Sequence, residues 1–243
     1  MICKSLLKRC QTPIVFFSLI FLVTAQDANG YSGLRKIMIK NQIISRGIKN
    51  TLVIEVMSEI PRHLFIDKSN WSLAYSDQPV PIGYGQTISQ PYIVAYMTEL
   101  LEAASHHKIL EIGTGSGYQA GILSKIAQQV YTIEIIPELS EIAFSNFKKL
   151  GYNNITTKVG DGYKGWPENA PFDRIILTAA PEEIPIALIE QLKPGGKMVL
   201  PLGPRWMRQE LLVLRKNSFG EITREKTIPV RFVPMIKDKK SKN

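Results

Sequence analysis

Short apolar runs alternate with longer helical patterns between residues 108 and 202, and this alternation is the strongest constraint on the fold. It predicts strands at residues 108–112, 130–135, 155–159, 172–178 and 197–202, and helices at residues 118–127, 137–150 and 184–192. A helix between two such strands returns the chain to the same edge of the sheet, so the strands run parallel. The sequence therefore predicts an α/β fold with a doubly wound, mostly parallel sheet and helices on both faces.

The N-terminal third has helical character without strands. Residues 33–60 place apolar side chains at helical spacing and predict two amphipathic helices broken near residues 47–50, the second ended by Pro61. Residues 62–86 have no sustained period and predict an ordered loop. A further helix is predicted at residues 91–104, because proline suits its first turn and apolar residues follow on one face.

The C-terminal part predicts an antiparallel hairpin at the sheet edge, because apolar runs at residues 210–215 and 222–230 follow each other without a helix. The predicted organisation is an apolar segment at residues 1–25, one domain at residues 31–236 and a basic tail at residues 237–243. Within the domain we expect a helical and loop part at residues 31–104, a core at 105–203 and C-terminal strands at 204–236.

Acidic and glycine residues gather where the predicted strands end. Glu111, Gly113, Gly115 and Gly117 form a strand-to-helix turn, Glu134 ends the next strand, and Asp161 and Gly162 follow the third. Singly, each acid could be a cap or a surface charge, and the glycines could make only a tight connection. Together they predict a ligand at the carboxyl edge of the sheet, where glycines allow close approach and acids bind ribose hydroxyls or an adenine amino group.

The spacing of the glycines helps to distinguish the ligand. A dinucleotide-binding turn of the form G-x-G-x-x-G would need a third glycine at position 118, which is Tyr118. The arrangement here is similar to the first motif of class I methyltransferases, whose cofactor is S-adenosylmethionine. The resemblance implies that this cofactor is held by Glu111, Gly113, Gly115, Gly117, Glu134, Asp161 and Gly162.

A second group of polar residues precedes the helix predicted at residues 91–104. Thr87 and Ser89 lie in a run with two glycines, Pro81-Ile-Gly-Tyr-Gly-Gln-Thr-Ile-Ser-Gln-Pro-Tyr92. On position alone, Ser89 or Gln90 could simply cap that helix.

The motifs taken together resemble a family. The run at residues 81–92, Leu110-Glu-Ile-Gly-Thr-Gly-Ser-Gly-Tyr118, Gly160-Asp-Gly162, Thr178-Ala-Ala-Pro181 and Arg231-Phe-Val-Pro234 are similar in order and spacing to bacterial protein-L-isoaspartate O-methyltransferases. The resemblance spans about residues 33–237. It implies methylation of the α-carboxyl group of L-isoaspartyl residues in damaged proteins and peptides, with Ser89 as the active-site serine. Hydroxyl donors at Thr87 and Ser89 can hold this carboxylate without removing its nucleophilic lone pair. The resemblance also implies that the ester closes to a succinimide without the enzyme.

Two other kinds of function stay open on the sequence. One is methylation of another acceptor, such as RNA or a small molecule, on the same fold. The other is a cofactor-binding interaction protein without catalysis. Six of the nine net positive charges lie at the two ends of the chain, so the sequence does not predict a nucleic-acid face. His63, His106 and His107 lack the spacing of metal ligands, so we expect no metal.

The N-terminal segment bears on location. Lys4, Lys8 and Arg9 precede an apolar stretch and small residues, which is typical of a signal peptide and contains both cysteines, Cys3 and Cys10. The cofactor and the family favour the cytoplasm, whereas this segment favours the periplasm or a membrane tether. Membrane contact is expected only through residues 1–25, if they are not cleaved, and a monomer is expected.

Overall fold

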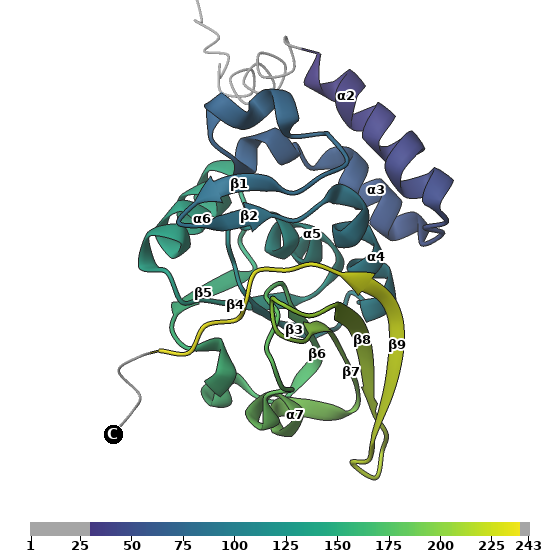
Figure 1. The fold of residues 1–243 in the computed structure, drawn as a ribbon, viewed down its shortest axis with the longest axis vertical. Coiled ribbons are helices and arrows are strands. Elements are labelled where there is room, and N and C mark those ends of the chain that lie inside the picture. The colour runs from purple at the N-terminus through teal and green to yellow at the C-terminus, as the bar shows by residue number, and fades with distance from the viewer. Residues whose placement is uncertain (1–29, 239–243) are drawn as a thin grey trace, which may run out of the picture.

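The structure, a computed structural model that describes residues 30–238, is built around a seven-stranded sheet with the order β5-β4-β3-β6-β7-β8-β9 (Figure 1). The strands are β3 (Lys108–Ile112), β4 (Gln129–Glu134), β5 (Ile155–Val159), β6 (Phe172–Leu177), β7 (Leu192–Leu202), β8 (Gln209–Lys216) and β9 (Ile222–Val230). The first five are parallel, and β8 and β9 extend the sheet in antiparallel fashion. The predicted mostly parallel α/β fold with an antiparallel C-terminal edge is confirmed.

The register of the three central strands places their carboxyl ends at one level. Ile112 of β3 pairs with Ile133 of β4 and with Leu177 of β6. The residues that follow these three therefore meet at the same edge, on both sides of the point where the strand order reverses. This is the position where ligands bind in open α/β sheets.

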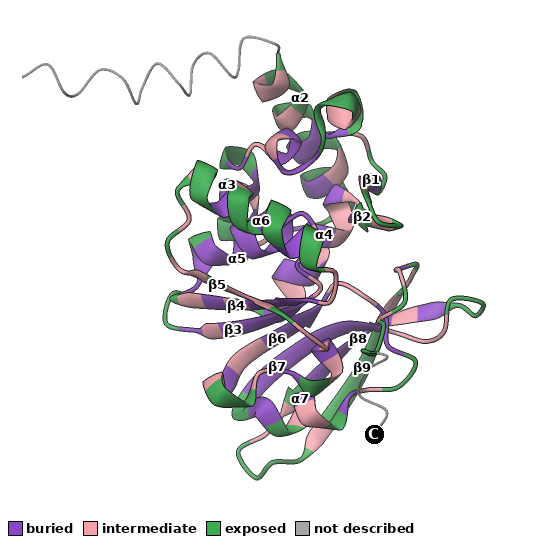
Figure 2. Ribbon diagram, turned by 90° about the vertical axis from the view of Figure 1, so that its left-hand side faces the viewer, coloured by how far each residue is buried: buried purple, intermediate pink, exposed green. Residues whose placement is uncertain are grey.

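The sheet is covered on both faces. Helices α4 (Pro91–Leu101), α5 (Tyr118–Ile126) and α6 (Pro137–Leu150) lie on one face, and α7 (Ile186–Gln191) lies on the other (Figure 2). The central strands are accordingly apolar on both sides, and Ile109, Leu110, Ile175 and Ile176 are completely buried. Helix α7 begins at Ile186 rather than at the predicted residue 184, after Pro185 at its N-cap.

A helical layer formed by residues 31–59 covers α4 and α5. It consists of α2 (Tyr31–Met38), a π-turn (Ile39–Ile43), a 3₁₀ turn (Ile44–Arg46) and α3 (Thr51–Glu59). The predicted break is confirmed: Gly47 adopts a left-handed conformation, and Asn50 caps α3 by accepting a hydrogen bond from the backbone N–H of Val53 at 3.2 Å.

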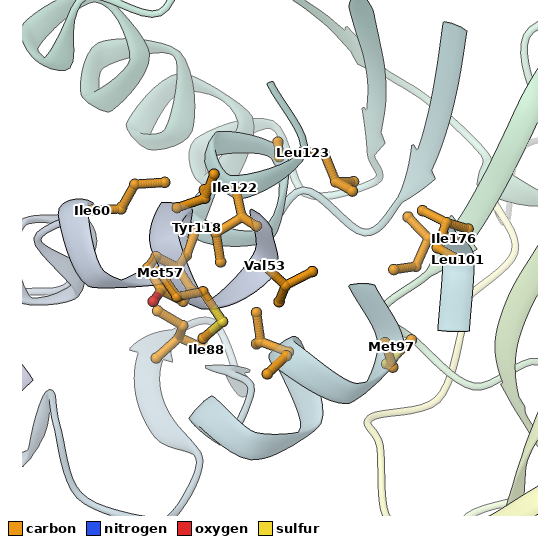
Figure 3. Close-up of a cluster of buried hydrophobic side chains, with 14 of the residues drawn as sticks. Val53, Met57, Ile60, Ile88, Met97, Leu101, Tyr118, Ile122, Leu123 and Ile176 are labelled. Carbon is orange, nitrogen blue, oxygen red and sulfur yellow. The ribbon is translucent and has the colours of Figure 1, made fainter. Parts of the chain in front are cut away.

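Apolar side chains join this layer to the rest of the molecule. Val53 and Met57 of α3 pack with Met97 of α4 and Ile122 of α5, and each is at most 2 % exposed (Figure 3). Burial of side chains of this size stabilises the fold by about 1.5–3 kcal/mol each. The layer therefore fixes α4 and α5, which both begin at the carboxyl edge of the sheet.

The stretch predicted as a loop contains regular structure that the sequence did not indicate. It includes two 3₁₀ turns (Arg62–Phe65 and Lys68–Leu73) and a hairpin of β1 (Val80–Gly83) and β2 (Gln86–Ile88). The turn residues Tyr84 and Gly85 have φ angles of 53° and 71°. A two-residue hairpin needs such angles, but the first of them is usually adopted by asparagine or aspartate rather than tyrosine. Strands of three and four residues are also too short to show a period, so the sequence carried no signal for this hairpin.

The chain after β9 crosses the carboxyl edge of the sheet (Figure 1). We call residues 231–236 the C-terminal strap. Its backbone pairs with Ala180: the Ala180 N–H donates to the Val233 carbonyl and the Met235 N–H donates to the Ala180 carbonyl, both at 2.8 Å. Within the described residues no helix is long and apolar enough to cross a membrane. Residues 1–25, predicted to be signal-like, lie outside the described part.

Gly117, the N-cap residue of α5, lies where α5 closely approaches α6. It has a φ of 87°, and a Cβ atom there would lie 2.6 Å from the ring of Phe147, whereas a Cβ at Gly151, with a φ of 75°, would meet nothing within 4 Å. Both alanine variants bear the strain of left-handed backbone, about 1–2 kcal/mol, and Gly117→Ala adds a clash of about 1–3 kcal/mol. We expect urea denaturation to show a larger loss of unfolding free energy for Gly117→Ala. Equal losses would contradict this packing.

Candidate active site

Two hollows meet at the carboxyl edge of the sheet. The inner pocket is lined by the ends of β3 and β4, by Gly162 and by the C-terminal strap. The outer cleft is lined by Ser89, Gln90, Ile93 and residues 229–233. Thr87, Thr178 and Val233 line both, so the two hollows share a wall.

The glycine-rich turn begins with a close contact between β3 and β6. Gly113 has a φ of 98°, and any Cβ atom there would overlap the hydroxyl oxygen of Thr178. That hydroxyl bonds to the carbonyl oxygens of Ile112 and Gly113, and the Thr178 N–H donates to the Ile112 carbonyl at 2.9 Å. Glycine is therefore required at position 113, and Thr178 holds the turn against the sheet.

Glu134 fixes the other side of the turn. Its Oε2 accepts a hydrogen bond from the Gly115 N–H at 2.8 Å, and its Oε1 accepts one from the Ile136 N–H at 3.0 Å. The side chain lines the inner pocket although it is only 5 % exposed. A carboxylate has about four acceptor sites, so each oxygen can still accept a bond from a ligand hydroxyl.

Glu111 lies behind the pocket wall, and its side chain is 0 % exposed. The Thr132 hydroxyl donates to its Oε2 and is also 2.6 Å from the Thr114 hydroxyl. The pKa of Glu111 is raised to about 8, mainly by burial; the Thr132 hydrogen bond opposes this shift, and the nearby Glu134 adds to it. A neutral Glu111 thus supports the turn from below, through Thr132 and Thr114.

The remaining predicted cofactor residues lie in two places. Gly162 lines the inner pocket, where a Cβ atom would overlap Ile112. Asp161 caps the turn that presents Gly162: its Oδ1 accepts from the Tyr163 N–H at 2.9 Å and its Oδ2 from the Asp238 N–H at 3.3 Å. Gly117 packs on Phe147, away from the pocket lining.

The structure excludes the capping interpretation of Ser89 and Gln90. Gln90 is the N-cap residue of α4, but its side chain makes no capping bond. Its amide donates instead to the backbone oxygen of Asp77 at 3.1 Å and to Oδ1 of Asp77 at 2.7 Å. Ser89 lines the outer cleft, and Thr87 lines both hollows.

His63 and His107 have structural surroundings, whereas His106 is exposed. His63 is buried, and its Nδ1 lies 2.8 Å from the Tyr75 hydroxyl. His107 accepts a hydrogen bond from the Ala104 N–H, and burial, with help from the charge of Arg174, lowers its pKa to about 4. Among residues 30–238, no group of three or more His, Cys, Asp or Glu side chains is placed to hold a metal ion.

Two residues of the site had not been assigned a role from the sequence. Thr178 gave a signal, because it is a hydroxyl residue at the carboxyl end of a predicted central strand. Arg62 gave none: it lies in the predicted loop, yet its guanidinium is completely buried and donates to the Ser89 carbonyl. Its contacts are distant in sequence, so no local pattern could reveal them.

The fold and the site define a class I methyltransferase. The chain belongs to the protein-L-isoaspartate(D-aspartate) O-methyltransferase family, whose model matches residues 34–240. It is 52 % identical over 202 residues to the protein-L-isoaspartate O-methyltransferase of Picosynechococcus sp., covering 83 % of this chain and 90 % of the relative. It is 46 % identical over 224 residues to enzyme 1 of that name from Nitrosospira multiformis, covering 91 % and 94 %.

Solved structures agree. A protein-L-isoaspartate O-methyltransferase superposes with a TM-score of 0.74 at 29 % identity, over 84 % of this chain and 65 % of that one. A Plasmodium falciparum chain assigned to the same activity, in complex with S-adenosyl-L-homocysteine, superposes with a TM-score of 0.72 at 25 % identity, over 84 % of this chain and 99 % of that one. The predicted family is confirmed.

The buried Glu111 predicts a dependence of stability on pH. Its folded pKa is about 8 and its ordinary value is 4.5, so between these pH values only the folded state holds the proton and stability falls as pH rises. Glu111→Gln removes this effect. The free energy of unfolding of the variant minus that of the native chain should therefore increase by about 1.4 kcal/mol for each pH unit over this range.

Urea unfolding of the cofactor-free protein at pH 5, 6, 7 and 8 measures this difference. The exposed Glu190→Gln serves as the control and should show no such trend. A difference between Glu111→Gln and the native chain that is the same at every pH would show that Glu111 is ionised in the folded state.

Proposed function

We propose that the chain transfers a methyl group from S-adenosylmethionine to the α-carboxylate of L-isoaspartyl residues, with the cofactor in the inner pocket and the acceptor in the outer cleft. The observation that carries this assignment is the wall of Thr87, Thr178 and Val233 that both hollows share. A group held in one hollow lies beside a group held in the other. Methyl transfer needs this adjacency, because the reacting atoms must be aligned at close range.

The residues of the inner pocket suit S-adenosylmethionine. Ile133, Ile135 and Met235 offer apolar surface for the adenine, and Glu134 offers acceptor sites for the ribose hydroxyls. The backbone of Gly113 and Gly115 lies open where the amino-acid end would pass. We assign Glu111, Gly117, Asp161 and Gly162 to shaping this pocket: Glu111 through Thr132, Gly117 by its approach to Phe147, and Asp161 by holding Gly162, with an acceptor site left for the adenine amino group.

When bound, S-adenosylmethionine supplies a methyl group made electrophilic by its sulfonium. The acceptor carboxylate, with an ordinary pKa near 4, is already ionised at neutral pH, so the protein need not supply a general base. Ser89 and Thr87 can donate hydrogen bonds that orient the carboxylate and leave a lone pair free for the methyl carbon. A buried cation in their place would stabilise the ground state and slow the reaction.

The residues that line the outer cleft also set the environment of the acceptor. Phe232, 9 % exposed, and Val233 of the C-terminal strap cover the cleft with apolar surface, which limits the access of water. Arg231 is an exposed residue of the cleft, so it can attract an anionic peptide without being buried against it. The methyl ester leaves the enzyme and closes to a succinimide without further catalysis, which begins repair.

We also propose that the chain works as a monomer in the cytoplasm, without a nucleic-acid partner. The cofactor is a cytoplasmic metabolite, and six of the nine net positive charges lie at the two ends of the chain, so no clustered basic face is expected. Sedimentation at micromolar concentration tests the first point. A fusion of residues 1–40 to a reporter active on only one side of the membrane tests the second, and periplasmic activity would overturn it.

Removal of the Ser89 hydroxyl tests the assignment of the outer cleft. Two peptides that differ only in an isoaspartyl or an aspartyl linkage are incubated with labelled cofactor, and base-labile methyl ester is counted. We expect ester on the isoaspartyl peptide alone, and kcat/KM about 10- to 100-fold lower in Ser89→Ala, because one oriented donor is lost. The exposed Ser58→Ala should react like the native chain. Full activity of Ser89→Ala would remove Ser89 from the site, and transfer to neither peptide would point to another acceptor.

Glu134→Gln tests the inner pocket separately. The loss of a charged acceptor for the ribose hydroxyls should weaken S-adenosylmethionine binding by about 1.5–3 kcal/mol, roughly 10- to 100-fold in Kd by calorimetry. Glu138→Gln, an exposed change in the first turn of α6, is the matched control. Unchanged affinity in Glu134→Gln would place the ribose elsewhere.

A further inference from the structure

Arg62 is a buried cation next to the acceptor side of the site. Its side chain is 0 % exposed, in the 3₁₀ turn that follows Pro61. Nε donates to the Ala74 carbonyl and Nη2 donates to the Ser89 carbonyl, both at 2.7 Å. The guanidinium carbon lies 4.9 Å from the ring centroid of Tyr118, the first residue of α5.

Packing alone does not explain a guanidinium at this place. Within residues 30–238 no carboxylate forms an ion pair with Arg62. Burial lowers its pKa to about 10, so the group still carries its charge at neutral pH. A well-packed apolar side chain would fill the same space without the desolvation cost of a charge. The carbonyl oxygens and the Tyr118 ring face compensate for part of that cost.

The three contacts join three separate parts of the chain. Ala74 belongs to the turn before the β1–β2 hairpin, Ser89 lies between that hairpin and α4, and Tyr118 directly follows the glycine-rich turn of the inner pocket. Arg62 therefore links the segment that carries the Ser89 hydroxyl to the element that carries the cofactor turn. A side chain with one donor could not hold both carbonyls in this way, because the planar guanidinium fixes the angle between its two bonds.

We propose that Arg62 is a positioning residue, which holds the backbone of Ser89 and so sets the place of its hydroxyl relative to the inner pocket. The inference rests on the proposed role of Ser89. It implies that loss of Arg62 affects the use of the acceptor far more than the binding of the cofactor. Small displacements in such alignments reduce rates strongly.

A double-mutant cycle with Arg62→Lys and Ser89→Ala tests the proposal. Each variant is assayed for kcat and KM with the isoaspartyl peptide, for the Kd of S-adenosylmethionine and for the urea midpoint. We expect Arg62→Lys to lower kcat/KM for the peptide about tenfold or more and to change the cofactor Kd less than about threefold. The loss in the double variant should be at least about fivefold smaller than the product of the two single losses, because Arg62 acts through Ser89.

A destabilised control variant distinguishes a positioning role of Arg62 from a general contribution to stability. Lys197→Ala is the matched control, because it removes both a buried side-chain stem and an ion pair: this lysine pairs with Glu102 and lies in register with Arg174, near the opposite edge of the sheet. It should lower the urea midpoint but leave kcat/KM for the peptide within about twofold of the native value. If Arg62→Lys does not fold, the cycle is run with Arg62→Gln, whose amide can still donate to one carbonyl.

The failures of the two proposals are distinguishable. Full activity of Ser89→Ala would remove the role of Ser89 itself. If Ser89→Ala is impaired but the two single losses of kcat/KM simply multiply in the double variant, the link through Arg62 is overturned. A loss in Arg62→Lys that lies in the cofactor Kd, or that Lys197→Ala reproduces at equal destabilisation, would overturn it as well.

Discussion

The contact between Gly113 and Thr178 is the constraint on which the site depends. The register of β3 with β4 and β6 brings these two residues and Glu134 to one level at the carboxyl edge of the sheet. No side-chain atom fits at position 113, so the Thr178 hydroxyl can bond to the backbone of the turn itself. The turn is thereby held from the β6 side by Thr178, from the β4 side by Glu134, and from below by Glu111 through Thr132.

The two halves of the site differ in how they are built. The inner pocket is formed mainly where parallel strands end, so its geometry follows from the sheet. The outer cleft is formed by parts that lie outside the parallel core: the segment after the β1–β2 hairpin, the start of α4 and the C-terminal strap. These parts are held by side chains from distant positions, such as Arg62 and Gln209, whose Oε1 accepts from the Phe232 N–H at 2.6 Å. With the proposed assignment of the two hollows, the sheet provides the cofactor pocket and the added segments provide the acceptor cleft.

Periodicity and chain punctuation were sufficient to predict most of the core. The strands at residues 108–112, 155–159 and 222–230 and the helix at residues 137–150 were predicted with the observed bounds, because proline, glycine and clear apolar runs delimit them. The β1–β2 hairpin was missed because its strands are short and Tyr84 is an unusual turn residue. Sequence spacing could bring Glu111, Glu134 and Asp161 to one edge, but it could not show that Glu111 is buried behind the wall. That depends on which way each side chain leaves its strand.

The C-terminal strap also affects when the site becomes complete. A ribosome releases the strands of the sheet in order from β3 to β9, and the strap emerges only after all of them. Val233 is a wall of both hollows and Met235 a wall of the inner one. A nascent chain that has reached residue 230 can therefore contain the whole sheet and still lack one side of each hollow. The site is therefore completed only when the last described segment of the fold has been made.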